Sequence, residues 1–90
     1  MKNNIPSVFS NLTRLKLIIC LDKGEKNVSD LINNCGLSQS AISQHLEKLR
    51  KANLVFTRRD GKEIFYNLKY KKTVEISKKI IDLQKEVNRK

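Results

Sequence analysis

Apolar residues in the first part of the chain are spaced as in a series of helices. From 11 to 22 they nearly encircle a helix, a pattern typical of a central, buried helix. From 28 to 35 they follow the i, i+3, i+4, i+7 spacing of an amphipathic helix, which Gly36 ends. The early proline favours a short first helix over residues 6–9. These patterns predict a helical N-terminal half.

The next helix follows almost at once. Only Leu37 separates Gly36 from Ser38, a favourable N-cap for a helix that runs to about Ala52. Helices joined by so short a glycine-containing turn form a helix-turn-helix, which is predicted here over about 28–52.

The pattern then changes to that of strands. Residues 54–59 and 63–68 are rich in strand-forming residues and flank Asp60-Gly61, a pair that readily takes positive φ and indicates a tight hairpin. A β-hairpin is therefore predicted over about 54–68. Directly after a helix-turn-helix, such a hairpin is the wing of a winged helix-turn-helix.

A long amphipathic helix is expected at about 71–88, with lysines on its polar face. Because only one end of it can lie against so small a core, the rest of its apolar stripe is expected to meet its copy in a second subunit. The alternative is a helix folded back on its own domain. The predicted dimer residues are Ile76, Ile80, Leu83 and Val87.

The whole chain, 1–90, is thus predicted to form a single winged helix-turn-helix domain. Its fold class is mainly α with a small β-hairpin, in the order α-α-α-α-β-β-α, and it dimerises through its terminal helices. A chain this small gains much by burying a further face in a partner subunit.

Charge narrows the class of partner. The chain has 19 Lys+Arg against 9 Asp+Glu, a formal net charge of +10. This favours a polyanionic partner, because neutralised phosphates release condensed counterions, and charge alone leaves DNA, RNA and anionic lipid open. A lysine-rich surface that serves solubility is the alternative.

No stretch approaches the roughly 20 apolar residues that span a bilayer, and the start lacks the apolar run of a signal peptide, so a cytoplasmic protein is expected.

Polar side chains gather at the start of the helix predicted from Ser38. Side chains that donate and accept hydrogen bonds in this position suit the base edges of a major groove. The alternative is that they only cap and solvate the helix. The predicted DNA-binding residues of this helix are Ser38, Gln39, Ser40, Ser43 and Gln44.

A cationic cluster lies at the tip of the predicted hairpin. Arg58, Arg59 and Lys62 surround Asp60-Gly61 and are well placed to straddle a phosphate backbone or enter a minor groove. Further cations that extend this predicted footprint are Arg14, Lys16, Lys48, Arg50 and Lys51.

Three segments resemble the ArsR/SmtB family of bacterial metal-responsive and redox-responsive repressors. Residues 9–18 (FSNLTRLKLI) resemble the family's second helix, 37–50 (LSQSAISQHLEKLR) its recognition helix and 58–66 (RRDGKEIFY) its wing. The resemblance is closest to the thiol-sensing, HlyU/BigR-like branch. It implies a homodimeric transcriptional repressor that binds double-stranded DNA. No cofactor is expected.

The metal sites of the family are not matched. Residues 27–30 contain no cysteine, and the last helix contains no histidine. His45, Cys20 and Cys35 are too few and too scattered for a structural zinc site, so no metal is expected. His45 is instead expected to pack at the edge of its apolar stripe and to satisfy its nitrogens locally.

Cys20 falls where the thiol-sensing branch has one of two reactive cysteines, but the usual partner on the last helix is missing. Cys35 is a substitute partner at the far end of the neighbouring helix, and a bridge requires Cα atoms within about 7 Å. Both are therefore candidate redox residues. Small, buried, unpaired thiols are the favoured expectation.

These features predict a dimeric repressor that reads an inverted-repeat operator, with a thiol response left open. The alternative is a winged-helix interaction module, an antagonist that heterodimerises with another regulator through the terminal stripe. No enzyme is expected, because nothing in the sequence provides an acid, a base and a nucleophile together.

Overall fold

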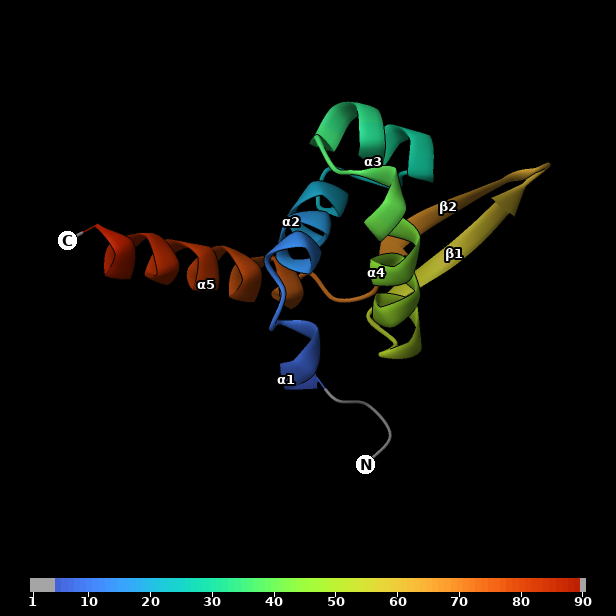
Figure 1. Cartoon of the computed structure of the whole chain (residues 1–90). Coiled ribbons are helices and arrows are strands. Elements are labelled where there is room, and N and C mark those ends of the chain that lie inside the picture. Colours follow the sequence, from blue (N-terminus) through green and yellow to red (C-terminus); the bar gives the residue numbers. More distant parts are fainter. Residues whose placement is uncertain (1–4, 90) are drawn as a thin grey trace.

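The computed structural model describes residues 5–89 of the chain and has the predicted winged helix-turn-helix architecture (Figure 1). Every element lies within one residue of its predicted position, so the predicted fold class is confirmed. The elements are α1 (Ile5–Val8), α2 (Leu12–Leu21), α3 (Val28–Cys35), α4 (Gln39–Lys51), β1 (Val55–Asp60), β2 (Glu63–Leu68) and α5 (Lys72–Asn88).

Local side-chain chemistry sets the helix ends. Asn11 caps α2 by accepting a hydrogen bond from the Arg14 backbone N–H at 3.1 Å. Asn27 and Asp30 form a capping box at the start of α3, in which each side chain accepts from the other's backbone N–H. Gly36 ends α3 in the left-handed conformation, with φ of 67°, and so allows the short turn into α4.

The central helix α2 is packed on several sides, as the near-complete ring of apolar residues predicted. Leu17 and Ile18 of α2 are fully buried, as is Leu31 of α3. Burial of one such side chain stabilises the fold by roughly 1.5–3 kcal/mol. The core formed around α2 therefore fixes how α3 and α4 are presented.

The wing is a two-stranded antiparallel sheet that ends with Asp60 opposite Glu63. Gly61 takes the left-handed conformation in the turn, with φ of 65°, where a side chain would be strained. The turn is centred on Gly61 and Lys62, one residue later than the predicted Asp60-Gly61 pair.

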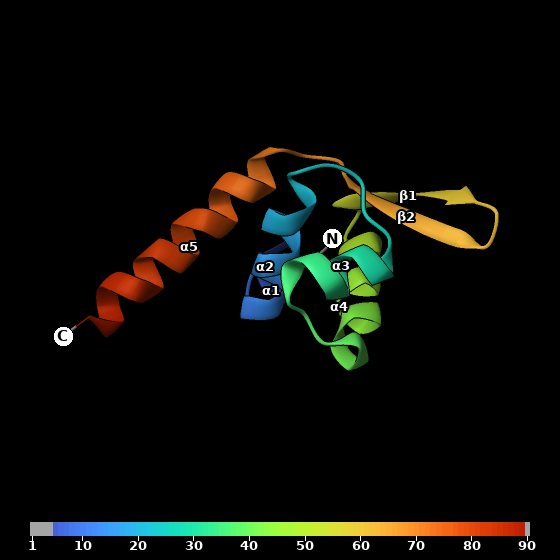
Figure 2. The ribbon, with the colours of Figure 1, turned by 90° about the horizontal axis from the view of Figure 1, so that it is seen from above.

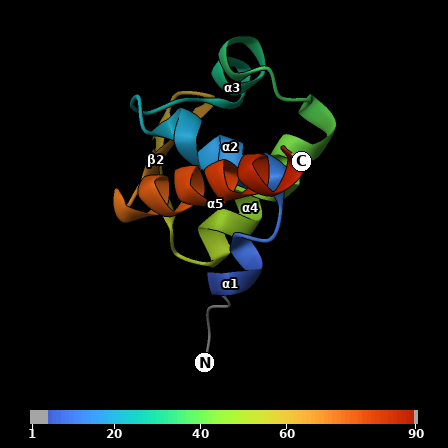
Figure 3. The same cartoon turned by 90° about the vertical axis from the view of Figure 1, so that its left-hand side faces the viewer.

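The first half of α5 is packed against the domain. Its buried residues, Thr73, Val74 and Ser77, lie near its N-terminus, where the helix contacts α2. Beyond them α5 extends away from the other elements (Figure 2) and crosses in front of α2 in the side view (Figure 3). The alternative of a helix folded back along its own domain is wrong. Within residues 5–89, no helix is long and apolar enough to cross a membrane.

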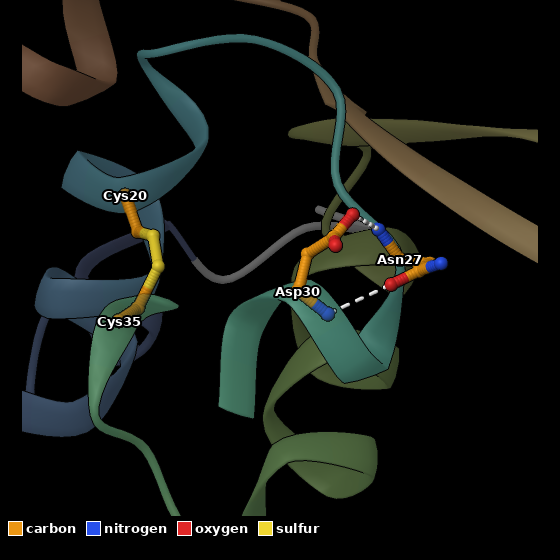
Figure 4. The surroundings of a disulfide bond; sticks show 4 residues. All are labelled: Cys20, Asn27, Asp30 and Cys35. Carbon is orange, nitrogen blue, oxygen red and sulfur yellow. Dashed lines mark hydrogen bonds between the residues drawn. A yellow bond between two sulfur atoms is a disulfide. The ribbon is translucent and has the colours of Figure 1, made fainter. Parts of the chain in front are cut away.

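A disulfide bond joins Cys20 to Cys35, so the expectation of unpaired thiols is wrong (Figure 4). Their Cα atoms lie 6.3 Å apart, within the range that such a bond requires. Cys20 lies in the last turn of α2 and Cys35 ends α3. The two cysteines meet because α3 packs its buried Leu31 against the core and so brings its C-terminus back to α2.

Candidate nucleic-acid interface

Helix α4, the second helix of the helix-turn-helix, has one buried side and one exposed side. Ile42, Leu46 and Leu49 are each 0% exposed, and their packing determines which residues face outward. The outward side chains are short or flexible and carry both donors and acceptors. They include every residue predicted on this helix to contact DNA: Ser38, Gln39, Ser40, Ser43 and Gln44.

Ser38 occupies the predicted N-cap position, but its side chain makes no capping hydrogen bond. No acidic residue lies in the first turn of α4. The partial positive charge at the start of a helix is favourable for a phosphate oxygen. The start of α4 therefore combines polar side chains with a backbone dipole that attracts anions.

Arg58 is exposed on the wing but is held by partners within the chain. Its Nε donates to Glu25 Oε1 at 3.1 Å, and its Nη2 donates to Oε2 of the same carboxylate. The guanidinium also lies 4.8 Å from the centre of the Phe65 ring. Hydrogen bonds from Arg58 and then from Asn67 lower the pKa of Glu25. Arg58 thus ties the wing to the loop between α2 and α3.

The side chains of Arg59 and Lys62 differ from that of Arg58, because they form no hydrogen bond or ion pair with any part of the chain that the structure describes. Because successive side chains of a strand point to opposite faces, Arg59 and Arg58 lie on opposite faces of the hairpin. Arg59 and Lys62 are therefore the wing cations most available to phosphate.

Further ties fix the direction of the wing. Lys26 and Tyr66 exchange backbone hydrogen bonds of 3.1 and 2.8 Å, which join the loop before α3 to β2. Asn27 Nδ2 donates to Glu63 Oε1 at 2.9 Å. An isolated hairpin is only marginally stable, so these contacts and the Glu25 pair hold the wing beside α4.

The other cations predicted in the footprint fall into different environments. Lys16, Lys48, Arg50 and Lys51 are exposed. Arg50 pairs with Glu47 on α4, with Nη2 2.6 Å from Oε2, which raises the pKa of Arg50 and lowers that of Glu47. Arg14 is only 7% exposed, because its guanidinium donates to main-chain carbonyls of α1. Its predicted place in the nucleic-acid surface is therefore wrong.

The predicted dimer stripe of α5 is largely uncovered. Leu83 and Val87 are 59% and 62% exposed, Ile76 is partly exposed and Ile80 is half-buried. An uncovered apolar stripe of this kind is typical of a surface that binds another protein. A mainly apolar hollow of about 380 Å³ lies beside it, and its lining includes Phe9, Leu12, Leu15, Ile80 and Ile81.

Residues 5–89 contain no group of three or more His, Cys, Asp or Glu side chains that could hold a metal ion. His45 is partly buried, and its Nδ1 lies 3.1 Å from Nη1 of Arg14. His45 thus packs at the edge of its apolar stripe, as expected, and its Nδ1 has a partner within the fold, Arg14 of α2.

A recognition helix with an exposed polar start, followed by a cationic hairpin, defines a winged helix-turn-helix protein of the kind that binds nucleic acid. The chain belongs to a particular family of this class. Residues 11–57, which run from the cap of α2 into β1, match the family "Bacterial regulatory protein, arsR family". The proteins to which it is similar are transcriptional regulators, which are not enzymes.

Relatives of known function support this assignment. Nodulation protein NolR of Rhizobium meliloti is 51% identical over 61 residues, which are 68% of this chain and 50% of that protein. Transcriptional repressor SdpR of Bacillus subtilis is 32% identical over 66 residues, 73% of each chain. The chain spans about half the length of NolR.

Solved structures show the same arrangement of elements. The transcriptional repressor BigR from Xylella fastidiosa superimposes with a TM-score of 0.75 at 33% identity, covering 87% of this chain and 80% of that one. The regulator HlyU from Vibrio vulnificus CMCP6 superimposes with a TM-score of 0.71 at 34% identity, covering 88% and 82%. The fold similarity thus extends beyond the matched segment 11–57 into the rest of the chain.

Proposed function

We propose that this protein is a dimeric transcriptional repressor that reads duplex DNA with α4. The observation that carries the proposal is the exposed row of Ser and Gln side chains on a helix whose opposite side is fully buried. Each base pair presents a distinct set of donors and acceptors in the major groove. Ser43 and Gln44 lie within the first two turns of α4, where a recognition helix contacts base edges.

Most of the affinity is expected to come from cations. The net charge of +10 favours a polyanion, and Arg59 and Lys62 have no competing partner in the described chain. In this proposal both residues contact phosphates, while Arg58 holds the wing in place. Binding should therefore weaken steeply as salt concentration rises.

The uncovered stripe of α5 provides the proposed dimer contact. A second copy that brings the same stripe against the first would bury Leu83 and Val87, which are the most exposed apolar side chains of this helix. A two-fold dimer presents two copies of α4, which suits an inverted repeat with half-sites about 34 Å apart. Occupation of such an operator would repress transcription by occlusion.

A thiol response is the second part of the proposal. A repressor acts on chromosomal DNA in the cytoplasm, where disulfides are mostly transient or redox-sensing. A dithiol reductant would convert the Cys20–Cys35 bond to two thiols and would itself become a disulfide. Since Cys35 directly precedes Gly36 and the turn into α4, this change would loosen the connection to the recognition helix.

Selection of duplexes from a random library tests the main proposal. Fluorescence anisotropy then compares the selected duplex with a shuffled duplex of the same composition. Ser43→Ala combined with Gln44→Ala should reduce the preference for the selected duplex by tenfold or more, since each lost base contact costs about 1–3 kcal/mol. Affinity for the shuffled duplex should be unchanged. No binding to any duplex at low salt would refute DNA binding, and an unchanged preference would refute the role of α4.

The thiol response is tested on the same selected duplex. The oxidised protein should bind more tightly than the protein reduced with dithiothreitol. The variant Cys20→Ser with Cys35→Ser cannot form the bond, so its affinity should be the same with and without the reductant. Equal affinities of the oxidised and reduced wild type would refute the thiol response and leave the main proposal intact.

A further inference from the structure

Arg14 is a cation buried within the fold without a carboxylate partner. It is 7% exposed, and no Asp or Glu in the described chain forms an ion pair with it. Its nitrogens are instead used as separate donors. Nε donates to Val8 O at 2.9 Å and Nη2 to Ser7 O at 3.1 Å, while Nη1 lies 3.1 Å from His45 Nδ1.

These contacts join three helices at one guanidinium. Arg14 belongs to α2, the two carbonyls belong to the end of α1, and His45 lies on α4 between exposed Gln44 and buried Leu46. Apolar packing decides which side of α4 is buried but has little directional preference. A hydrogen bond at the border of the stripe is directional, so it also constrains the rotation of the helix.

The contact requires neutral His45. A guanidinium only donates, so Nδ1 must accept and the ring proton must be on Nε2. Burial, then the positive charges of Arg14 and Lys48, lower the pKa of His45. The groups that face the ring are Arg14 from α2 and Lys48 from α4 itself. Through Arg14, α1 contributes only the uncharged carbonyls of Ser7 and Val8.

We propose that Arg14 is a positioning residue for DNA reading, which holds the recognition helix in register with α1 through a hydrogen bond to neutral His45. The inference rests on the proposed function. When His45 is protonated, its Nδ1 becomes a donor that faces a guanidinium donor, and two positive charges oppose each other. The helix then loses its directional constraint, while the added charge favours non-specific attraction to DNA.

The direction of the pH effect follows from the lowered pKa. The folded protein favours neutral His45, so its contribution to stability is complete above the ordinary value of 6.5 and declines as pH falls below it. His45 is the only histidine in the sequence. A histidine charge change between about pH 7.5 and 5.5 is therefore assigned to His45.

The test measures sequence preference against pH. Anisotropy gives the affinities for the selected and the shuffled duplex at pH 7.5 and pH 5.5. For the wild type, the ratio of the two affinities should fall on acidification, by less than tenfold because the pKa of His45 is lowered from its ordinary value of 6.5. His45→Asn retains an acceptor oxygen near the Nδ1 position and does not titrate, so it should keep a high ratio at both pH values.

Further variants separate positioning from simple stability. His45→Phe retains a ring without a hydrogen-bond acceptor, and Arg14→Lys retains the positive charge without the planar set of N–H donors. Both variants should give a low ratio of selected to shuffled affinity at both pH values. Circular dichroism identifies any variant that fails to fold, in which case the wild type and His45→Asn decide. The proposal is overturned if the wild-type ratio does not change with pH, or if His45→Asn loses its preference on acidification as the wild type does.

Failure of the proposed function would be recognised separately. If the wild type binds no duplex at pH 7.5, DNA binding is refuted and the reading role of Arg14 is refuted with it. The contact itself is then judged by the ¹⁵N resonances of Arg14 Nε and His45 Nδ1 in the protein without DNA. They should shift together on acidification in the wild type, and the Arg14 resonance should not shift in His45→Asn.

Discussion

The helices α4 and α5 have similar amphipathic patterns in the sequence but opposite environments in the fold. The apolar stripe of α4 is completely covered, with Leu46 0% exposed. The stripe of α5 is largely uncovered, because Ile76, Leu83 and Val87 are 37%, 59% and 62% exposed and Ile80 is half-buried. An apolar stripe thus indicates that a helix is packed against something, but not whether the partner lies in the same chain.

The difference also indicates where each helix acts. Because its apolar side is fully used, α4 presents only its polar side to a partner, and that side suits the donors and acceptors of DNA. In α5 the unused surface is the apolar stripe itself, which suits a protein surface. The same sequence pattern therefore supports two functions, which depend on how much of the stripe the domain covers.

Matched truncations of one leucine in each helix should show the largest effect. Leu46→Ala removes a fully buried side chain and should lower the free energy of unfolding by about 2–5 kcal/mol. Leu83→Ala removes an exposed one, so its cost should appear only through the proposed dimer. Urea unfolding at low and high protein concentration checks this, because the effect of Leu83→Ala should depend on concentration. Equal costs at every concentration would contradict the contrast between the helices.

A charge introduced into the apolar stripe of α5 should have the next largest effect, which is on the stability of the proposed dimer. Leu83→Asp places a carboxylate where the proposed partner stripe would lie, so the dimer should dissociate at micromolar concentration. Lys85→Asp adds a carboxylate at another exposed position of α5, outside the predicted stripe, and should leave the dimer intact. Sedimentation velocity distinguishes the two outcomes. If Lys85→Asp dissociates the dimer as much as Leu83→Asp does, the stripe is not the contact.

The positions of the helices and strands could be predicted closely, because each of them has a recognisable local pattern in the sequence. Helical spacing gives way to strand spacing, and caps or glycines mark the ends. Asn27 with Asp30 begins α3, and Gly36 ends it. The polar side of α4 followed in the same way, since it lies opposite an apolar stripe. The first and last residues of each element could therefore be predicted without knowing how the helices are arranged in space.

What could not be predicted depends on that arrangement. Arg14 was expected at the surface because it is charged, but the end of α1 supplies carbonyl acceptors that make its burial possible. Cys20 and Cys35 were expected to lie apart, but α3 returns to α2. Glu25 was not recognised as a partner for the wing. It lies 33 residues from Arg58 in the sequence, and nothing in the sequence indicates that the two side chains are in contact.

Removal of one cation from the wing beside α4, or of one from α5, should have a smaller effect, which is measured on DNA affinity. Arg59→Ala, on the wing beside α4, should weaken binding to selected and shuffled duplexes alike and reduce the slope of log affinity against log salt by about 1. Lys79→Ala removes an exposed cation from α5 and should leave that slope unchanged. Salt titrations by anisotropy check both variants. An equal loss of slope in both would indicate that general charge, and not the wing, attracts the DNA.

The smallest effect is expected from the ion pair that holds the wing beside α4. Because Arg58 lowers the pKa of Glu25, the pair contributes stability above the ordinary value of 4.5, and this contribution is lost as pH falls through the lowered pKa. Glu25→Gln should remove this pH dependence and increase hydrogen exchange in the wing at neutral pH. Glu63→Gln is the matched control, because the Asn27 amide can donate equally well to a glutamine oxygen. Exchange of the β1 and β2 amides measured by NMR should therefore increase in Glu25→Gln and not in Glu63→Gln, and the reverse result would place the main tie of the wing at Asn27.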